Sequence, residues 1–99
     1  MKNMVVIIHE KLQQDLADQL REQVSGFTFS RVEGHGDQRV DDDLLSARDR
    51  VVGYIPRVRV DILLEDTEVA GVIELIRQVP GIAGHSVYWV NDVVESGRI

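Results

Sequence analysis

The chain has 99 residues, contains no cysteine and carries a formal net charge of −6. This length corresponds to one domain, and the absence of cysteine excludes disulfides, thiolate nucleophiles and cysteine-type zinc sites. Nucleic-acid-binding proteins usually show a basic patch, whereas the basic residues here are few and spread out. We therefore expect a single small domain, residues 1–99, that has no nucleic-acid partner.

The first third of the sequence predicts a strand, a helix and a second strand. Residues 4–8 form a short apolar run rich in β-branched side chains, which is typical of a buried strand. Between residues 11 and 24 the apolar period changes to four, which predicts an amphipathic helix. The repeating residues are Leu12, Leu16, Leu20 and Val24. Gly26 follows at a position that favours a left-handed helix cap, and the alternation over 27–32 predicts the second strand.

Residues 51–64 predict a third strand with two different faces. Pro56 near its start suits an edge or a bend rather than a central ladder position. One face is apolar and the other is charged. The apolar face consists of Val58, Val60, Ile62 and Leu64, and the charged face of Arg57, Arg59 and Asp61.

The last third of the sequence predicts a helix and a fourth strand. Asp66 or Thr67 suits the helix N-cap, and Pro80-Gly81 ends the helix. Its apolar stripe consists of Val69, Val72, Ile73 and Ile76. Residues 87–94 form the last strand, in which Tyr88 and Trp89 point to opposite faces. Trp89 either covers an open sheet face at a subunit interface or packs in the core.

These elements predict an α+β fold of the ferredoxin-like βαββαβ type. Four strands would form an antiparallel sheet, with both helices on one face. The other face is also partly apolar, so we expect oligomers that cover it. Residues 34–50 interrupt the pattern: these seventeen residues carry five Asp and three Arg without a sustained period. A loop this long in a compact domain is usually functional or disordered.

Motifs of catalysis are missing from the sequence. It contains no G-x-S-x-G, H-E-x-x-H, Walker or C-x-x-C pattern, and no nucleophile and base are recognisable together. We therefore expect a protein that is not an enzyme. The apolar run at the N-terminus is too short for a signal peptide, and no segment approaches a membrane span. These features predict a cytoplasmic protein that does not insert into the membrane.

Several polar features of the loops allow two interpretations. Gly34-His35-Gly36 is either a tight exit from the second strand or an anion-binding turn. Asp41-Asp42-Asp43 is either solvated, which is more common for a charge run, or a ligand set for a hard cation. His35 and His85 each lie beside a glycine, which makes them accessible. Leu44 and Leu45 either dock on a partner protein or fold back onto the domain.

Two segments resemble the signature strands of PII signal-transduction proteins. Gly26-Phe27-Thr28-Phe29-Ser30-Arg31-Val32-Glu33-Gly34-His35-Gly36 is similar to their second strand and its V-x-G-x-G ending. Val51-Val52-Gly53-Tyr54-Ile55-Pro56-Arg57-Val58-Arg59-Val60 is similar to their third strand, V-V-x-F-L-P-K-V-K-I. The resemblance implies a homotrimer that binds ligands, usually adenine nucleotides, in clefts between subunits. It also implies that residues 37–50 are the T-loop, which reports the ligand to a transporter, channel or enzyme.

The resemblance also implies which residues serve each role. Arg57 takes the place of a ligand-contacting lysine, and Gly84 falls in the B-loop. The implied cleft residues are Thr28, Gly34, His35, Gly36, Gln38, Arg57, Gly84, His85 and Arg98. The implied partner-binding residues of the loop are Asp42, Leu44, Leu45, Arg48 and Arg50.

The sequence departs from the PII pattern at the positions that grip phosphates. Ile82 and Val87 stand where lysines are expected, and a phosphate cradle without its cations loses much of its attraction. Arg50 replaces the tyrosine that many PII proteins have modified. The G-F-T, G-H-G, Y-W-V and closing G-R-I elements are similar to a PII-like subgroup encoded beside heavy-metal efflux systems. That similarity implies an adenine nucleotide or a divalent transition metal as ligand, with His35 and His85 as metal ligands.

Three functions remain open from the sequence. The first is a PII-like trimeric sensor that regulates a transporter, an efflux component or an enzyme through residues 37–50. The second is a metal-binding protein of the CutA type that uses His35 and His85. The third is a small ferredoxin-like enzyme, which we rank last because only a histidine could act as its acid or base near neutral pH.

Overall fold

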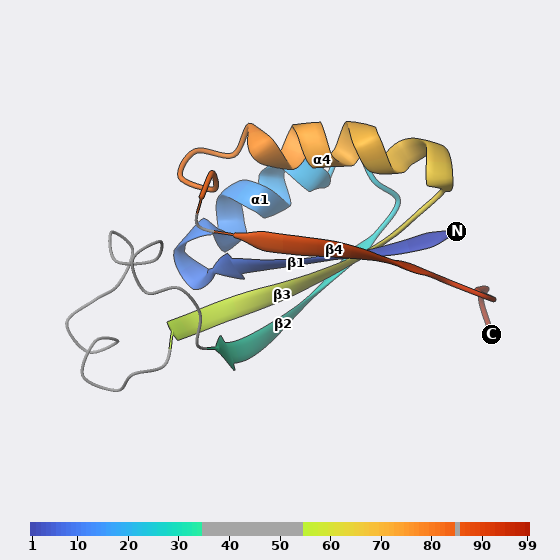
Figure 1. Cartoon of the computed structure of the whole chain (residues 1–99), viewed down its shortest axis with the longest axis horizontal. Helices are drawn as coiled ribbons and strands as arrows, with labels where there is room; N and C mark the ends of the chain where they lie inside the picture. Colours follow the sequence, from blue (N-terminus) through green and yellow to red (C-terminus); the bar gives the residue numbers. More distant parts are fainter. Residues whose placement is uncertain (35–54, 85) are drawn as a thin grey trace.

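A computed structural model, which describes residues 1–34, 55–84 and 86–99, contains a four-stranded antiparallel sheet with two α-helices on one face (Figure 1). The strands lie in the order β2-β3-β1-β4. Their bounds are β1 Lys2–His9, β2 Phe27–Gly34, β3 Ile55–Leu64 and β4 Val87–Asp92. The predicted ferredoxin-like fold is therefore confirmed, and β2 and β4 are the edge strands of the sheet.

Helix α1 (Gln13–Leu20) is shorter than the predicted helix over residues 11–24. A 3₁₀ turn, η1 (Glu10–Leu12), precedes it, and backbone hydrogen bonds from Gln23 and Val24 to the carbonyl of Leu20, at 3.0 and 3.1 Å, end it. Val24 repeats the apolar spacing but lies beyond the helix, packed against the core. The left-handed cap predicted at Gly26 is wrong, because the helix ends well before that residue. Among the described residues, positive φ angles occur only at Gly81 and Gly84.

Helix α4 (Val69–Arg77) also follows a 3₁₀ turn, η3 (Asp66–Glu68). The N-cap of this turn is Glu65 and that of α4 itself is Glu68, rather than the predicted Asp66 or Thr67. The backbone N–H of Glu65 donates to Oε1 of Glu68 at 2.9 Å, which makes this turn a capping box. Gly81, with a φ of 83°, then takes the chain back toward β4. A left-handed conformation of this kind costs little only for glycine.

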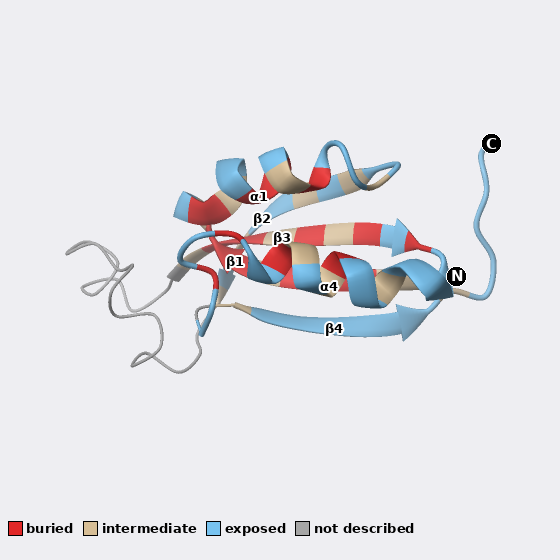
Figure 2. Cartoon of the chain, turned by 90° about the horizontal axis from the view of Figure 1, so that it is seen from above, coloured by how far each residue is buried: buried red, intermediate tan, exposed pale blue. Residues whose placement is uncertain are grey.

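The core lies between the sheet and the two helices (Figure 2). The strand alternation and the helical stripes that the sequence predicts supply its side chains. Its buried members are Met4, Val6, Ile8, Leu12, Leu16, Leu20, Val58, Val60, Ile62, Leu64, Val72, Ile76, Val79 and Ile82. Phe27 and Phe29 of β2 pack against this cluster and touch each other edge to face, with ring centroids 5.3 Å apart.

Neither of the described α-helices lies over the other face of the sheet, which we call the open face (Figure 1). Leu63, Val87 and Trp89 are exposed there, so the expected partly apolar surface is confirmed. Val5 is the exception: flanked in register by Asp61 and Trp89, it is fully buried. All six residues of β4 are exposed, including those on the helix-covered side (Figure 2).

Pro56 lies where the sheet changes from four strands to two. The last pair between β1 and β3 is His9 with Arg57, so Pro56 has a register partner only on the β2 side, namely Glu33. Because proline lacks an N–H, it is tolerated at a position with one neighbouring strand. The prediction that Pro56 does not occupy a central ladder position is therefore confirmed, although β3 itself is a central strand. In the ranges given above, no helix is long and apolar enough to span a bilayer.

Candidate functional site: two half-sites on the open face

Gly34 and Arg57 lie together at the end of the sheet where β2 and β3 project. The register pairs Gly34 with Ile55 and Arg57 with Val32, which places Gly34 and Arg57 on the same face. A Cβ built at Gly34 would lie 3.4 Å from Cδ and 3.5 Å from Nε of Arg57. These are ordinary van der Waals distances, so the Arg57 side chain packs directly beside Gly34. Arg57 is only 9% exposed, which is rare for an arginine.

Gly84 lies at the same end of the sheet. It precedes β4, whose first residue, Val87, pairs with Ile7 of β1 near the Arg57 end of the ladder. Its φ of 77° requires the left-handed conformation, which a side chain would strain. Gly34 and Arg57 form the first half-site, which we call the loop-end half-site; Gly84 instead lines a cavity on the helix-covered side.

Thr28 and Arg98 lie together in a cavity of about 630 Å³ at the opposite end of the open face. Thr28 is the register partner of Asp61, which lines the same cavity. The other lining residues are Asn3, Ser25, Gly26, Phe27, Leu63 and Val93. We call Thr28, Asp61 and Arg98 the tail half-site. Along β2, Thr28 lies four positions, or about 13 Å, from Val32, which is the register partner of Arg57.

An ion pair fixes the carboxylate of the tail half-site. Arg59 donates to the two carboxylate oxygens of Asp61, with donor–acceptor distances of 3.0 and 3.1 Å. The Asn3 amide donates to the same carboxylate at 3.3 Å. The hydrogen bond from Arg59 holds the pKa of Asp61 below its usual value, and burial opposes that shift. The same bond raises the pKa of Arg59, whose guanidinium carbon lies 6.0 Å from the ring centroid of Trp89.

Part of the predicted site lies outside the described residues. This applies to the cleft residues His35, Gly36, Gln38 and His85, and therefore to the whole predicted metal pair. It also applies to the loop residues Asp42, Leu44, Leu45, Arg48 and Arg50. Within 1–34, 55–84 and 86–99, no group of three or more histidine and acidic side chains is placed to hold a metal ion.

Asp61 and Asn3 are the site residues that sequence reasoning missed. The alternation of β3 assigns Asp61 to the charged face together with Arg57 and Arg59, so that part of the signal was present in the sequence. The register between the strands cannot be read from the sequence. Only the pairing of Thr28 with Asp61, and of Asp61 with Val5, places this carboxylate between Thr28 and β1.

Nearly the whole sequence matches a known protein family. The family model "Protein of unknown function (DUF3240)" matches residues 2–99. The chain is similar to a protein named nitrogen regulatory protein P-II from Mesorhizobium japonicum, with 29% identity over the whole chain and 91% of that protein. A protein of the same name from Rhizobium leguminosarum bv. viciae is 32% identical over 77% of the chain and 70% of its own length.

The fold also has a counterpart among solved structures. The crystal structure of a DUF3240 family protein from Shewanella baltica superposes with a TM-score of 0.78 at 18% identity, and the match covers 99% of this chain and 94% of that one. This likeness supports the fold alone, whereas the family match covers nearly all of the sequence. The chain therefore belongs to the DUF3240 family, within the superfamily of PII-like proteins.

Proposed function

We propose that this protein is a trimeric PII-like regulator that is not an enzyme, binds a small ligand between subunits and contacts a partner protein through residues 37–50. The observation that carries the proposal is the division of the predicted cleft residues into two half-sites. Arg57 and Gly34 lie at one end of the open face, and Thr28 and Arg98 lie at the other. A small ligand that needs both half-sites would take one from each of two neighbouring copies.

The open face supplies a surface for that assembly. Its exposed apolar side chains, Leu63, Val87 and Trp89, surround the Arg59–Asp61 ion pair. Burying apolar side chains favours association. Because Arg59 and Asp61 are already paired with each other, removing them from water costs less than removing two separate charges. The names of the P-II relatives support a regulatory role, and the absence of catalytic motifs from the sequence agrees with it.

We further propose that the ligand is an adenine nucleotide or a divalent transition metal ion and that the partner is a transporter or an efflux component. The resemblance to the subgroup encoded beside heavy-metal efflux systems supports the metal. The buried Arg57 and the exposed Arg98 support an anionic ligand, since guanidinium groups bind phosphate oxygens well. Action on a partner in the cytoplasm follows from the same resemblance.

Mass measurement tests the assembly. Light scattering after size-exclusion chromatography should give about 34 kDa, three times the chain mass of 11.2 kDa. A species that stays at the mass of one chain at micromolar concentration would overturn the trimer.

A thermal-shift screen with ATP, ADP, AMP, cyclic nucleotides, bicarbonate and divalent metals tests the ligand. A ligand at about 100 times its dissociation constant stabilises the protein by about 2.7 kcal/mol, which moves the melting temperature by several degrees. Arg98→Gln and Arg57→Gln should each abolish a nucleotide shift, while Arg21→Gln on the helix side should keep it. A shift that survives both cleft variants would place the ligand elsewhere.

A further inference from the structure

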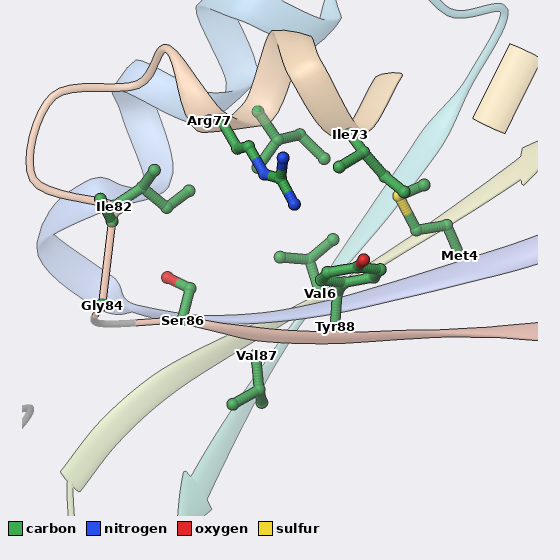
Figure 3. Close-up of a pocket in the computed structure, with 11 residues that line it drawn as sticks. Met4, Val6, Ile73, Arg77, Ile82, Gly84, Ser86, Val87 and Tyr88 are labelled. Carbon is green, nitrogen blue, oxygen red and sulfur yellow. The ribbon is translucent and has the colours of Figure 1, made fainter. Parts of the chain in front are cut away.

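A cavity of about 320 Å³ lies between helix α4 and strand β4, on the helix-covered side of the sheet (Figure 3). Gly34, Arg57, Thr28, Asp61 and Arg98 do not line this cavity, whereas Gly84 does. Most of the lining is aliphatic. The apolar walls are Met4, Val6, Ile73, Ile76 and Ile82. Pockets for small molecules commonly begin at about 300 Å³ and combine apolar walls with a few polar groups.

Ser86 supplies the first polar group of this cavity. Its Oγ is buried, and it has no hydrogen-bond partner in the part of the chain that the structure describes. Figure 3 shows this oxygen on the cavity side of β4, directed toward Ile82. Because buried polar atoms are nearly always hydrogen-bonded, to protein or to water, this hydroxyl is free to bond to a polar group that enters the cavity.

Arg77 supplies the second polar group. Its side chain extends from the end of α4 and turns its guanidinium into the cavity (Figure 3). Nη1 donates to Oε1 of Glu74 at 2.9 Å. A guanidinium has five N–H donors, so the bond to Glu74 leaves donors for an anion. The Arg77 side chain is 63% exposed, so an anion can reach it from solvent.

We propose that this cavity binds a small monocarboxylate with an aliphatic tail. The tail would lie against Ile73, Ile76 and Ile82, and the carboxylate would accept hydrogen bonds from Arg77 and Ser86. The ion pair with Glu74 leaves little net charge at the cavity mouth, which favours a single negative charge over a polyphosphate. The inference rests on one chain and does not depend on a trimer or on the cleft ligand.

Isoleucine methyl groups provide built-in reporters for a test with octanoate as the probe. In a sample of the full chain with ¹³C-labelled isoleucine methyls, octanoate should shift the signals of Ile73, Ile76 and Ile82 in a saturable way. Ile7 lies on the open face and should not shift. The uncharged analogue 1-octanol should bind roughly tenfold more weakly, because it cannot form the charged hydrogen bond.

Two variants and a matched control complete the test. Arg77→Gln should weaken octanoate binding roughly tenfold and leave 1-octanol unchanged. The control is Arg21→Gln, because Arg21 follows α1 and pairs with Asp18 at the same i, i+3 spacing, 3.9 Å apart. It should leave both affinities unchanged. Ser86→Leu should fill the cavity and remove both ligands; if that variant does not fold, the Arg77 comparison still decides.

Three outcomes would overturn the proposal. The first is the absence of a saturable shift at the three reporter methyls with millimolar octanoate. The second is equal affinity for octanoate and 1-octanol, which would make the cavity a purely apolar site. The third is an equal shift at Ile7, which would show that octanoate adsorbs to the protein without a specific site.

Discussion

The two faces of the sheet differ sharply, although the same strands form them. On the helix-covered face Ile62 is fully buried, while its neighbour Leu63, on the open face, is 48% exposed. The first face is uniformly apolar along β3, whereas the second combines Arg59, Asp61 and the exposed Trp89. The first face thus holds the chain together, and the second is available for recognition. The experiments below test that division.

The largest expected effect comes from shortening a core side chain. Ile62→Ala should lower the free energy of unfolding by about 2–5 kcal/mol, because it removes buried methyl groups and leaves a cavity. At a concentration low enough to keep the chain monomeric, Leu63→Ala should cost less than about 1 kcal/mol, since much of that side chain then contacts water. Urea unfolding followed by circular dichroism measures both. A larger loss at Leu63 that shrinks on dilution is what burial of the open face in the proposed trimer would give.

The next effect concerns the assembly itself. Trp89→Ala should weaken association of the proposed trimer by about 2 kcal/mol, because large aromatic side chains dominate the energetics of interfaces. Tyr88→Ala is the control, since Tyr88 neighbours Trp89 on the same edge strand but points to the helix-covered side. Sedimentation equilibrium of both variants gives the comparison. Equal weakening would show that the edge of β4, not the open face, controls assembly.

The smallest effect is a pH dependence from Asp61. Its pKa is lower in the folded state than in the unfolded chain, so its stabilisation is present above the unfolded value of about 3.9 and is lost as pH falls through the folded pKa. Asp61→Asn should therefore destabilise the protein at pH 7, and the difference from wild type should shrink as pH falls through the folded pKa of Asp61. Solvent screening limits the effect to about 0.5–1 kcal/mol.

Urea unfolding at a series of pH values would measure this difference. Glu22→Gln, a change at an exposed position beyond the end of α1, serves as the control. A constant difference between wild type and Asp61→Asn at every pH would show that the Arg59 hydrogen bond does not perturb this carboxylate.

Periodicity predicted the fold because apolar side chains repeat at the spacing of each element. The alternation of Val58, Val60, Ile62 and Leu64 identified the buried face of β3 correctly. Element ends were less predictable, because they depend on hydrogen bonds that the pattern does not encode. Val24 continues the spacing of α1 but lies past its end, and Glu65 caps the α4 segment in place of the more typical Asp66 or Thr67.

The candidate site was predictable only in part. The resemblance to PII strands identified Thr28, Gly34 and Arg57, and the structure shows which of them lie together. The cavity beneath Arg77 left no signal in the sequence. Its lining comes from two strands, a helix and the turn after it, so no spacing along the chain relates Val6 to Ile73 or Ser86. Such a space exists only once the elements pack.

The strand order also constrains how the chain folds as it is synthesised. In the described sheet, β1 and β2 are separated by β3, so neither has a neighbour among the strands made before residue 55. Pairing of β1 with β3 joins segments that are far apart in the sequence, for example Val6 with Val60. Contacts of this range carry a large loop-closure entropy and slow folding. In a nascent chain that does not yet include β3, the apolar residues of β1 and β2 therefore have no neighbouring strand to pair with. The sheet can begin to form only after residues 55–64 have been synthesised.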